Sequence, residues 1–174
     1  MKKTITFWQL LGFIITSISG TLLHFLYDWL GRPLLIAPLS AVNESTWEHM
    51  KILYWPMFVF AIVQAFYFKE QRHYWAIKLK GILLGLILIP LLFYSYNQFI
   101  GKSPDWINIS IFFISAAAAY FYEAICFKKA PRTFGFPKIC INLLCLIGAF
   151  FIITTFFPLE LGIFRDPVTG AYGR

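Results

Sequence analysis

Five ionisable side chains in the first third of the chain have the residue types and the spacing for acid–base or metal chemistry. They are His24, Asp28, Glu44, Glu48 and His49. Residues four positions apart on a helix project from one face, which groups His24 with Asp28 and, if the next helix already includes them, Glu44 with Glu48. Imidazole and carboxylate groups bind Zn²⁺, and histidine also exchanges protons near neutral pH. The pattern therefore predicts a polar pocket that binds a metal ion or a proton.

The composition of the chain makes this polar cluster informative. Of 174 residues, 59% are hydrophobic and 13% are charged, and the mean hydropathy is +0.69. In a chain of this kind most side chains face lipid, where an ionisable group costs about 2.5–3.5 kcal/mol unless it is paired, hydrated or bound to a metal. Residues that carry such a cost usually mark a functional site.

The elements that must position these groups are apolar runs long enough to cross a bilayer, which takes about 20 helical residues. They cover approximately residues 5–30, 48–68, 75–99, 106–127 and 137–157. We predict an all-α fold, a polytopic integral membrane helix bundle of about five transmembrane helices. It forms a single domain over residues 1–174, with the small-residue tract 115–119 packed closely between helices. The expected location is the cell (cytoplasmic) membrane, with the lipid bilayer as partner and an oligomer as an open alternative.

The distribution of basic residues predicts the orientation of the bundle. Five of the fifteen fall on one side, namely Arg32, Lys51, Lys102, Arg165 and Arg174. Ten fall on the other: Lys2, Lys3, Lys69, Arg72, Lys78, Lys80, Lys128, Lys129, Arg132 and Lys138. The side richer in lysine and arginine is usually cytoplasmic, so the N-terminus is predicted inside and the C-terminus outside. Because the net charge of +7 is spread over short loops, it argues against nucleic-acid binding.

This topology brings most acids and two of the three histidines to the outer side. The link 31–42 contains Pro33 and Pro38 and is too short to span a membrane as a helix, so it is predicted to form a re-entrant or interfacial turn. The cluster would then converge at the outer membrane boundary. Asn97 and Asn108, which follow in later runs, are expected to donate hydrogen bonds to it.

Several of the same residues also have local structural interpretations. Ser45 and Glu48 have the spacing of a capping box at a helix start, and Asn43 is an alternative cap. His24 with Asp28 is also explained by a hydrogen bond within one helix. Lys51 is expected to extend toward the membrane interface. At the inner surface, Glu123 is expected to pair with Lys128 or Lys129.

The segment 158–174 has turn-forming chemistry that is unusual for the end of a membrane protein. Asp166 and Pro167 precede a glycine at position 170, and apolar residues on either side could anchor the segment. We predict that this tail folds back over the pocket as a lid, with Glu160, Arg165 and Asp166 near the site. A loosely ordered terminus is the alternative.

The motif Asn43-Glu44-Ser45-x-Trp47-Glu48-His49, preceded by residues 24–28, resembles an uncharacterised family of small bacterial integral membrane proteins. This resemblance implies a membrane location. Ser45 and His49 also resemble the serine and histidine of the membrane hydrolases related to alkaline ceramidases and adiponectin receptors. Those hydrolases bind zinc with that histidine and a later H-x-x-x-H pair, which this sequence lacks, so a zinc site here would need carboxylates.

The sequence leaves three functional classes open. In a metal-dependent hydrolase acting on a lipid-like substrate, Zn²⁺ or another divalent metal would be held by His24, His49 and Asp28. The catalytic candidates are then Glu44, Glu48 and Ser45, and the supporting or lid residues are Asn43, Trp47, Asn97, Glu160, Arg165 and Asp166. In a cation- or proton-coupled binding or transport protein, the same carboxylates would hold a proton or a small cationic ligand. A non-catalytic membrane subunit is the third class, and haem ligation by the two histidines is a more distant one.

Overall fold

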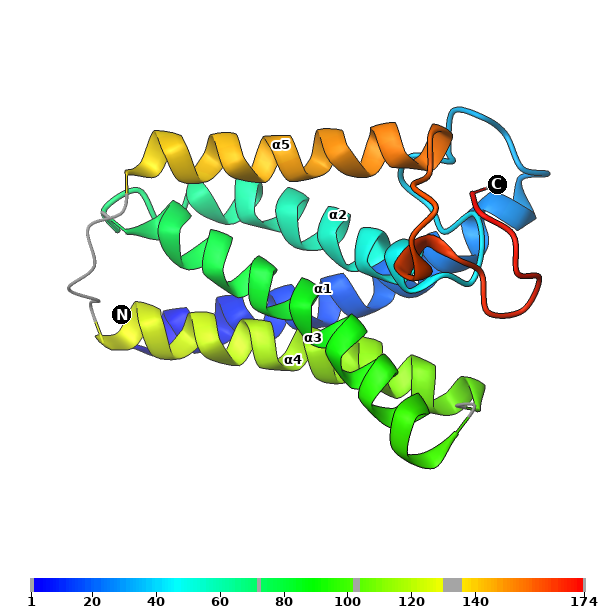
Figure 1. Cartoon of the computed structure of the whole chain (residues 1–174). Helices are drawn as coiled ribbons and strands as arrows, with labels where there is room; N and C mark the ends of the chain where they lie inside the picture. Colours follow the sequence, from blue (N-terminus) through cyan, green and yellow to red (C-terminus); the bar gives the residue numbers. More distant parts are fainter. Residues whose placement is uncertain (1, 72, 102–103, 130–135, 174) are drawn as a thin grey trace.

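The computed structural model describes residues 2–71, 73–101, 104–129 and 136–173, and it is all-helical over these residues. The helices are α1 (Lys2–Trp29), α2 (Thr46–Ala65), α3 (Tyr74–Ile100), α4 (Asp105–Lys129) and α5 (Pro137–Phe156), followed by the 3₁₀ turn η1 (Gly162–Phe164). They run up and down along a common direction (Figure 1). The N-terminal end of the bundle is the one at which α1 begins, and the C-terminal end is the one at which the tail lies.

Four of the helices, α1, α3, α4 and α5, are long and apolar enough to cross a membrane, which supports a membrane protein. The fifth, α2, lies among the others, and eleven of its twenty residues are buried. These include the polar residues Glu48, Lys51 and Gln64, and α2 is not among the helices whose length and composition suit a membrane crossing. The basic residues Arg72, Lys102, Arg132 and Arg174, on which the predicted orientation partly depends, lie outside the described residues.

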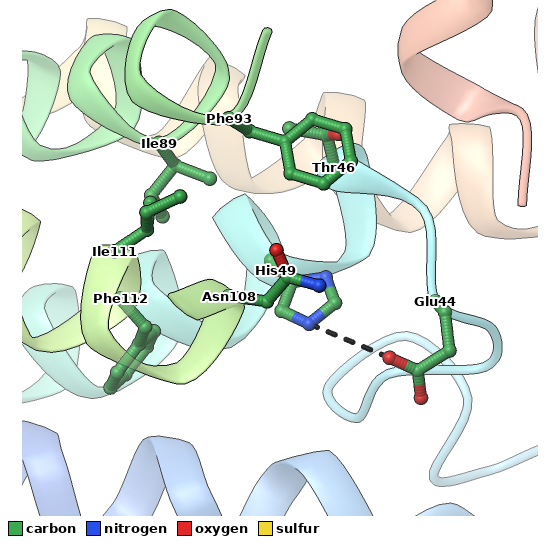
Figure 2. Close-up of a pocket in the computed structure, with 8 residues that line it drawn as sticks. All are labelled: Glu44, Thr46, His49, Ile89, Phe93, Asn108, Ile111 and Phe112. Carbon is green, nitrogen blue, oxygen red and sulfur yellow. Dashed lines mark ion pairs between the residues drawn. The ribbon is translucent and has the colours of Figure 1, made fainter. Parts of the chain in front are cut away.

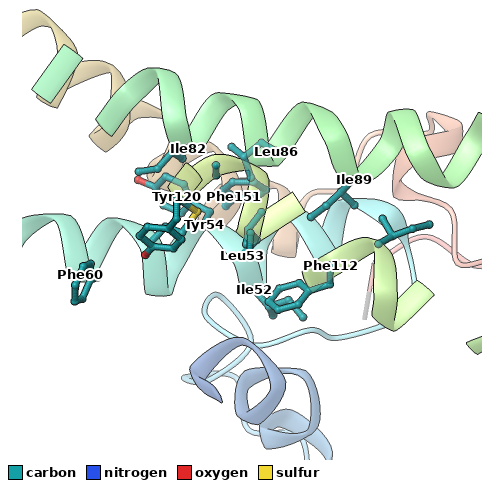
Figure 3. Close-up of a cluster of buried hydrophobic side chains, with 14 of the residues drawn as sticks. Ile52, Leu53, Tyr54, Phe60, Ile82, Leu86, Ile89, Phe112, Tyr120 and Phe151 are labelled. Carbon is teal, nitrogen blue, oxygen red and sulfur yellow. The ribbon is translucent and has the colours of Figure 1, made fainter. Parts of the chain in front are cut away.

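The core is built around α2 and the faces of α3, α4 and α5 that turn toward it. Leu53 and Tyr54 of α2 are fully buried and pack with side chains of the other helices, among them Ile82, Leu86, Tyr120, Leu144 and Phe151 (Figure 3). Large apolar side chains such as Phe99 remain exposed on the outside of the bundle. Apolar side chains on the outside of the bundle are compatible with a lipid environment, in which it is charged groups that are costly.

Small residues allow α3 and α4 to approach each other closely. Ser115, Ala116 and Ala119 of α4 are all fully buried. A Cβ atom placed on Gly85 of α3 would lie 3.4 Å from the Cβ of Ala119 and 3.0 Å from Leu53. The predicted role of the small-residue tract in helix packing is therefore confirmed.

The link between α1 and α2 stays at the C-terminal end of the bundle and does not cross it (Figure 1). The hydroxyl of Ser40 donates to the carbonyl of Leu23 and accepts a hydrogen bond from the backbone N–H of Tyr27 at 3.0 Å. The indole of Trp55 donates to the carbonyl of Pro38 at 2.9 Å. These bonds hold the link against α1 and α2, and so fix the place of Glu44 at its far end.

Candidate metal centre

Three of the predicted site residues come together at the C-terminal end of the bundle. His24 is in the penultimate turn of α1, Glu44 is in the link, and His49 is in the first turn of α2. The Nε2 atoms of His24 and His49 each lie 3.7 Å from Oε2 of Glu44. One ligand atom from each residue lies within 4.8 Å of the other two. The site is therefore made by three segments that are distant from one another in the sequence.

The start of α2 sets the orientation of the His49 ring. Ser45 is the N-cap residue, and its hydroxyl accepts a hydrogen bond from the backbone N–H of Glu48 at 3.4 Å. The carbonyl of Ser45 lies 2.9 Å from Nδ1 of His49. Because a carbonyl oxygen can only accept, Nδ1 carries the hydrogen, and in a neutral ring Nε2 is left with a lone pair. A histidine that donates from one nitrogen to a backbone carbonyl is the usual arrangement in metal sites.

Ring contacts hold His24 beside His49. The two imidazoles meet edge to face with their centroids 5.2 Å apart, and the ring of His24 stacks on that of Phe25 at 4.8 Å. The Glu44 side chain is about half exposed, whereas both histidines are mostly covered. Two imidazole nitrogens thus face a carboxylate that can still reach water.

The donor set and its spacing fit a divalent transition metal. Zn²⁺ bonds of about 2.0–2.2 Å in tetrahedral geometry place neighbouring ligand atoms roughly 3.4 Å apart. The separation between each imidazole nitrogen and the carboxylate oxygen is 3.7 Å, close to this value, while the group as a whole lies within 4.8 Å and would have to close slightly around an ion. Two histidines and one glutamate are also the ligand set of one class of catalytic zinc site, in which the fourth position stays open.

A small, partly open pocket adjoins these residues, and its interior space of about 20 Å³ is close to what one water molecule needs. Its polar lining comes from Glu44, Thr46, His49 and Asn108 (Figure 2). Its apolar lining comes from α3 and α4 and consists of Ile89, Phe93, Ile111 and Phe112. The predicted contribution of Asn108 to the site agrees with this placement. The four apolar residues could not be singled out from the sequence, because they are typical of any membrane helix.

Glu48, a catalytic candidate from the sequence, is buried away from the pocket in an ion pair. Its carboxylate lies 2.5 Å from Nζ of Lys51 and accepts a hydrogen bond from the backbone N–H of Val42 at 3.0 Å. Lys51 also donates to the carbonyl of Ala37 at 2.8 Å and to the hydroxyl of Thr155 at 3.0 Å. The expectation that Lys51 extends to the membrane interface is wrong, because every donor finds a partner inside the protein.

Asp28 is not part of the group formed by the two histidines. Its carboxylate lies 2.7 Å from Nε of Arg32, four residues later, and both side chains are well exposed. Glu44, and not Asp28, therefore lies with the two histidines. Asn97 lies in the last turn of α3 and does not line the pocket.

The tail packs against the start of α2 and does not line the pocket. The ring of Phe164 lies 4.5 Å from that of Trp47, whose indole donates to the hydroxyl of Thr154 at 2.9 Å. Asn43 connects the two segments, because its side-chain N–H donates to the carbonyl of Gly173 at 2.6 Å and its oxygen accepts from the backbone of Ser45. The tail thus folds back, as predicted, but over the residues that begin α2.

The remaining tail candidates have structural contacts of their own. Asp166 is buried and accepts hydrogen bonds from the backbone N–H of Val168 at 2.7 Å and from the hydroxyl of Thr169 at 2.9 Å. Arg165 donates to the carbonyl of Gly170 at 3.3 Å. Glu160 is exposed. None of the three lines the pocket, so their place is in the tail turn rather than beside the histidines.

A second buried ion pair, far from the pocket, was missed by the sequence analysis. Glu123 of α4 lies 2.6 Å from Nζ of Lys78 of α3, and both side chains are buried. The expectation that Glu123 pairs with Lys128 or Lys129 is wrong, because its partner is on the neighbouring helix. The sequence did contain one sign of this ion pair. An acidic side chain at membrane depth is costly unless it has a partner, so a partner for Glu123 was to be expected.

Comparison with known proteins identifies the chain only at the level of a family. No curated protein and no solved structure matches it. One family matches over residues 1–174, the full length of the chain, and its description is a family of unknown function. The chain therefore belongs to the family of unknown function DUF6512.

Proposed function

We propose that this protein is a membrane metalloprotein that binds Zn²⁺ or another divalent transition metal through His24, Glu44 and His49. The observation that carries the proposal is the convergence of two imidazole nitrogens on one carboxylate oxygen, each at 3.7 Å. The hydrogen bond from Nδ1 of His49 to the carbonyl of Ser45 adds to it, because it leaves Nε2 available to a metal. The site would lie on the outer side of the cell membrane.

The most fitting activity is hydrolysis of a lipid-like substrate. Zn²⁺ held by three protein groups can polarise a carbonyl and activate water for attack. Ile89, Phe93, Ile111 and Phe112 give the pocket an apolar wall that suits an acyl chain. The amide of Asn108 and the hydroxyl of Thr46 are placed to orient a polar group near His49. Glu48 and Ser45 support the site from the start of α2 instead of acting on substrate.

Metal binding is tested first by elemental analysis of detergent-purified protein prepared without a metal-affinity step. We expect about one metal ion per chain, as the three-ligand site implies. His24→Ala and His49→Ala should each lower metal affinity by more than about 100-fold, since loss of even a supporting group costs about 10–100-fold. His73→Ala is the matched control, because His73 precedes α3 at the opposite end of the bundle.

The same variants separate the metal site from the hydrolase activity. Full metal retention in both His24→Ala and His49→Ala, with His73→Ala unchanged, would contradict the site. If the metal is bound as expected, release of fatty acid from ester- and amide-linked lipids should require it and stop with a chelator. A metal-loaded protein that hydrolyses none of these lipids would retain the site but contradict the activity. In that case the same ligands would serve cation binding or transport.

A further inference from the structure

The half of the bundle nearer the N-terminal end contains a second group of buried polar residues, separate from the candidate metal centre. Lys78 of α3 and Glu123 of α4 form an ion pair of 2.6 Å, and their side chains are 1% and 0% exposed. Only one of the two carboxylate oxygens takes part in it. The other, Oε1, is buried and has no hydrogen-bond partner among the described residues. A Cβ on Gly81 would collide with this carboxylate, so it lies directly against α3.

Aromatic rings surround the ammonium group of Lys78. Its Nζ lies 5.3 Å from the ring centroid of Tyr120, 5.7 Å from that of Phe60 and 6.0 Å from that of Tyr74. The faces of aromatic rings attract cations at such distances. The rings can therefore stabilise the charge of Lys78 even when the charge of its carboxylate partner is neutralised.

Gln9 of α1 contributes a polar side chain at the same level. It is 4% exposed, and neither its amide nitrogen nor its amide oxygen has a partner among the described residues. Its helical neighbours show where it lies. Ile5, one turn earlier, packs with Tyr74, and a Cβ on Gly12, one turn later, would lie 2.5 Å from the ring of Tyr120. Gln9 is on the same face of α1 between these two positions, beside the rings that surround Lys78.

We propose that Gln9, Lys78 and Glu123 form a proton-binding site that is reached by water within the membrane bundle. A hydronium ion gives its proton to the Glu123 carboxylate, which forms an O–H bond and leaves a neutral water. The positive charge that remains on Lys78 is held by the three rings, while the Gln9 amide hydrogen-bonds the incoming water or the protonated carboxyl group. The reverse transfer releases the proton.

The other groups that face this site are few and do not compete at neutral pH. Tyr74 and Tyr120 carry the nearby titratable hydroxyls. Tyr74 donates to the carbonyl of Ala61 at 2.6 Å, and the hydroxyl of Tyr120 lies 2.7 Å from that of Thr16. From α2, Phe60 and Gln64 are the facing residues, and neither titrates. Glu123 is therefore the acid that would take up the proton.

Infrared spectroscopy of the full chain in lipid tests this proposal over a titration from about pH 9 to about pH 4, the range in which carboxyl groups and histidine ordinarily titrate. We expect a protonated-carboxyl band that grows as the pH falls and shifts in D₂O. The other acids of the chain also protonate toward pH 4, so the Glu123 component is taken from the difference between the wild-type and variant titrations. Glu123→Gln should remove this component. Glu70→Gln, which alters an exposed acid near the same end of the bundle, should leave it in place.

Gln9→Leu provides a second test that does not depend on the folding of Glu123→Gln. The substitution replaces an unpartnered amide with an apolar helix former, so the bundle should remain stable. Loss of one hydrogen bond to the protonated carboxyl should change its proton affinity by about tenfold and move the band. A Glu123 band that is unchanged in Gln9→Leu would contradict the place of Gln9 in the site. A wild-type protein with no band from Glu123 at any pH would show that the ion pair serves helix packing alone.

Discussion

At the scale of single residues, the candidate metal centre depends on which carboxylate the two histidines face. Asp28 shares a helix face with His24 by spacing, and the sequence therefore favoured it as a ligand. In the structure the side chain of Asp28 turns to Arg32, which also lies four residues away but in the opposite direction along the chain. Helical spacing shows which residues are able to meet, but it does not choose between two partners at the same spacing.

Lys51 gives a direct test of how the link is held in place. Lys51→Met should lower the free energy of unfolding by about 3–5 kcal/mol, because it leaves the buried Glu48 carboxylate without its counter-ion. The measurement is denaturant unfolding in detergent. Lys80→Met is the matched control, since Lys80 is exposed on α3. Equal stability of the two variants would mean that the Lys51–Glu48 pair does not hold the link.

The buried ion pairs also show what a sequence can and cannot predict about charges. That Glu123 requires a partner follows from the cost of a charge in lipid. The identity of the partner does not, because Lys78 is 45 residues away and on another helix. Lys128 and Lys129 were nearer in sequence, yet they lie at the end of α4, where water is available to them.

At the scale of elements, the start of α2 was largely predictable. Ser45 caps the helix as expected from its type and its position before an apolar run. Only half of the predicted capping box forms, because the Glu48 carboxylate does not accept a hydrogen bond from the Ser45 N–H. The carboxylate contacts Lys51 and the backbone N–H of Val42 instead. The side-chain oxygen of Asn43 accepts the hydrogen bond from the Ser45 N–H. The helix begins at Thr46, two residues before the predicted start.

The close contact of α3 and α4 predicts that the same substitution has different effects on two faces of α4. Ala119 is fully buried near Gly85, whereas Ala117 is exposed. Ala119→Leu should lower stability by about 1–3 kcal/mol through overpacking, and Ala117→Leu should have little effect. Thermal unfolding in detergent measures both. If Ala119→Leu is as stable as the wild type, the two helices do not pack through these small residues.

At the scale of the whole molecule, the helical bundle could be predicted because each apolar run has the length of a membrane crossing. The pocket could not be predicted in the same way. It forms where α2, α3 and α4 meet, and its apolar lining residues have no distinguishing pattern. α2 shows the limit of hydropathy, since this largely buried helix is not among those whose composition suits a membrane crossing.

The five helices and the distribution of basic residues predict the placement of the two termini. The start of α1 and the tail lie at opposite ends of the bundle, as five crossings would require (Figure 1). Since the sequence assigns ten of the fifteen basic residues to the N-terminal side, that side should be cytoplasmic. A reporter that is active only outside the cytoplasm should work at the C-terminus and fail at the N-terminus. Activity at both termini, or at the N-terminus alone, would contradict this topology.

The most direct test of the metal centre is a competition titration of Zn²⁺ against a chromophoric chelator with three purified proteins. The wild type should bind one ion. Glu44→Gln should weaken Zn²⁺ binding by about 100-fold or more, because the amide is a poor replacement for the ligating carboxylate. Asp28→Asn should bind as the wild type does, because Asp28 pairs with Arg32 and lies outside the group. A wild type that does not bind Zn²⁺, or one whose affinity depends on Asp28 and not on Glu44, would contradict the proposed site.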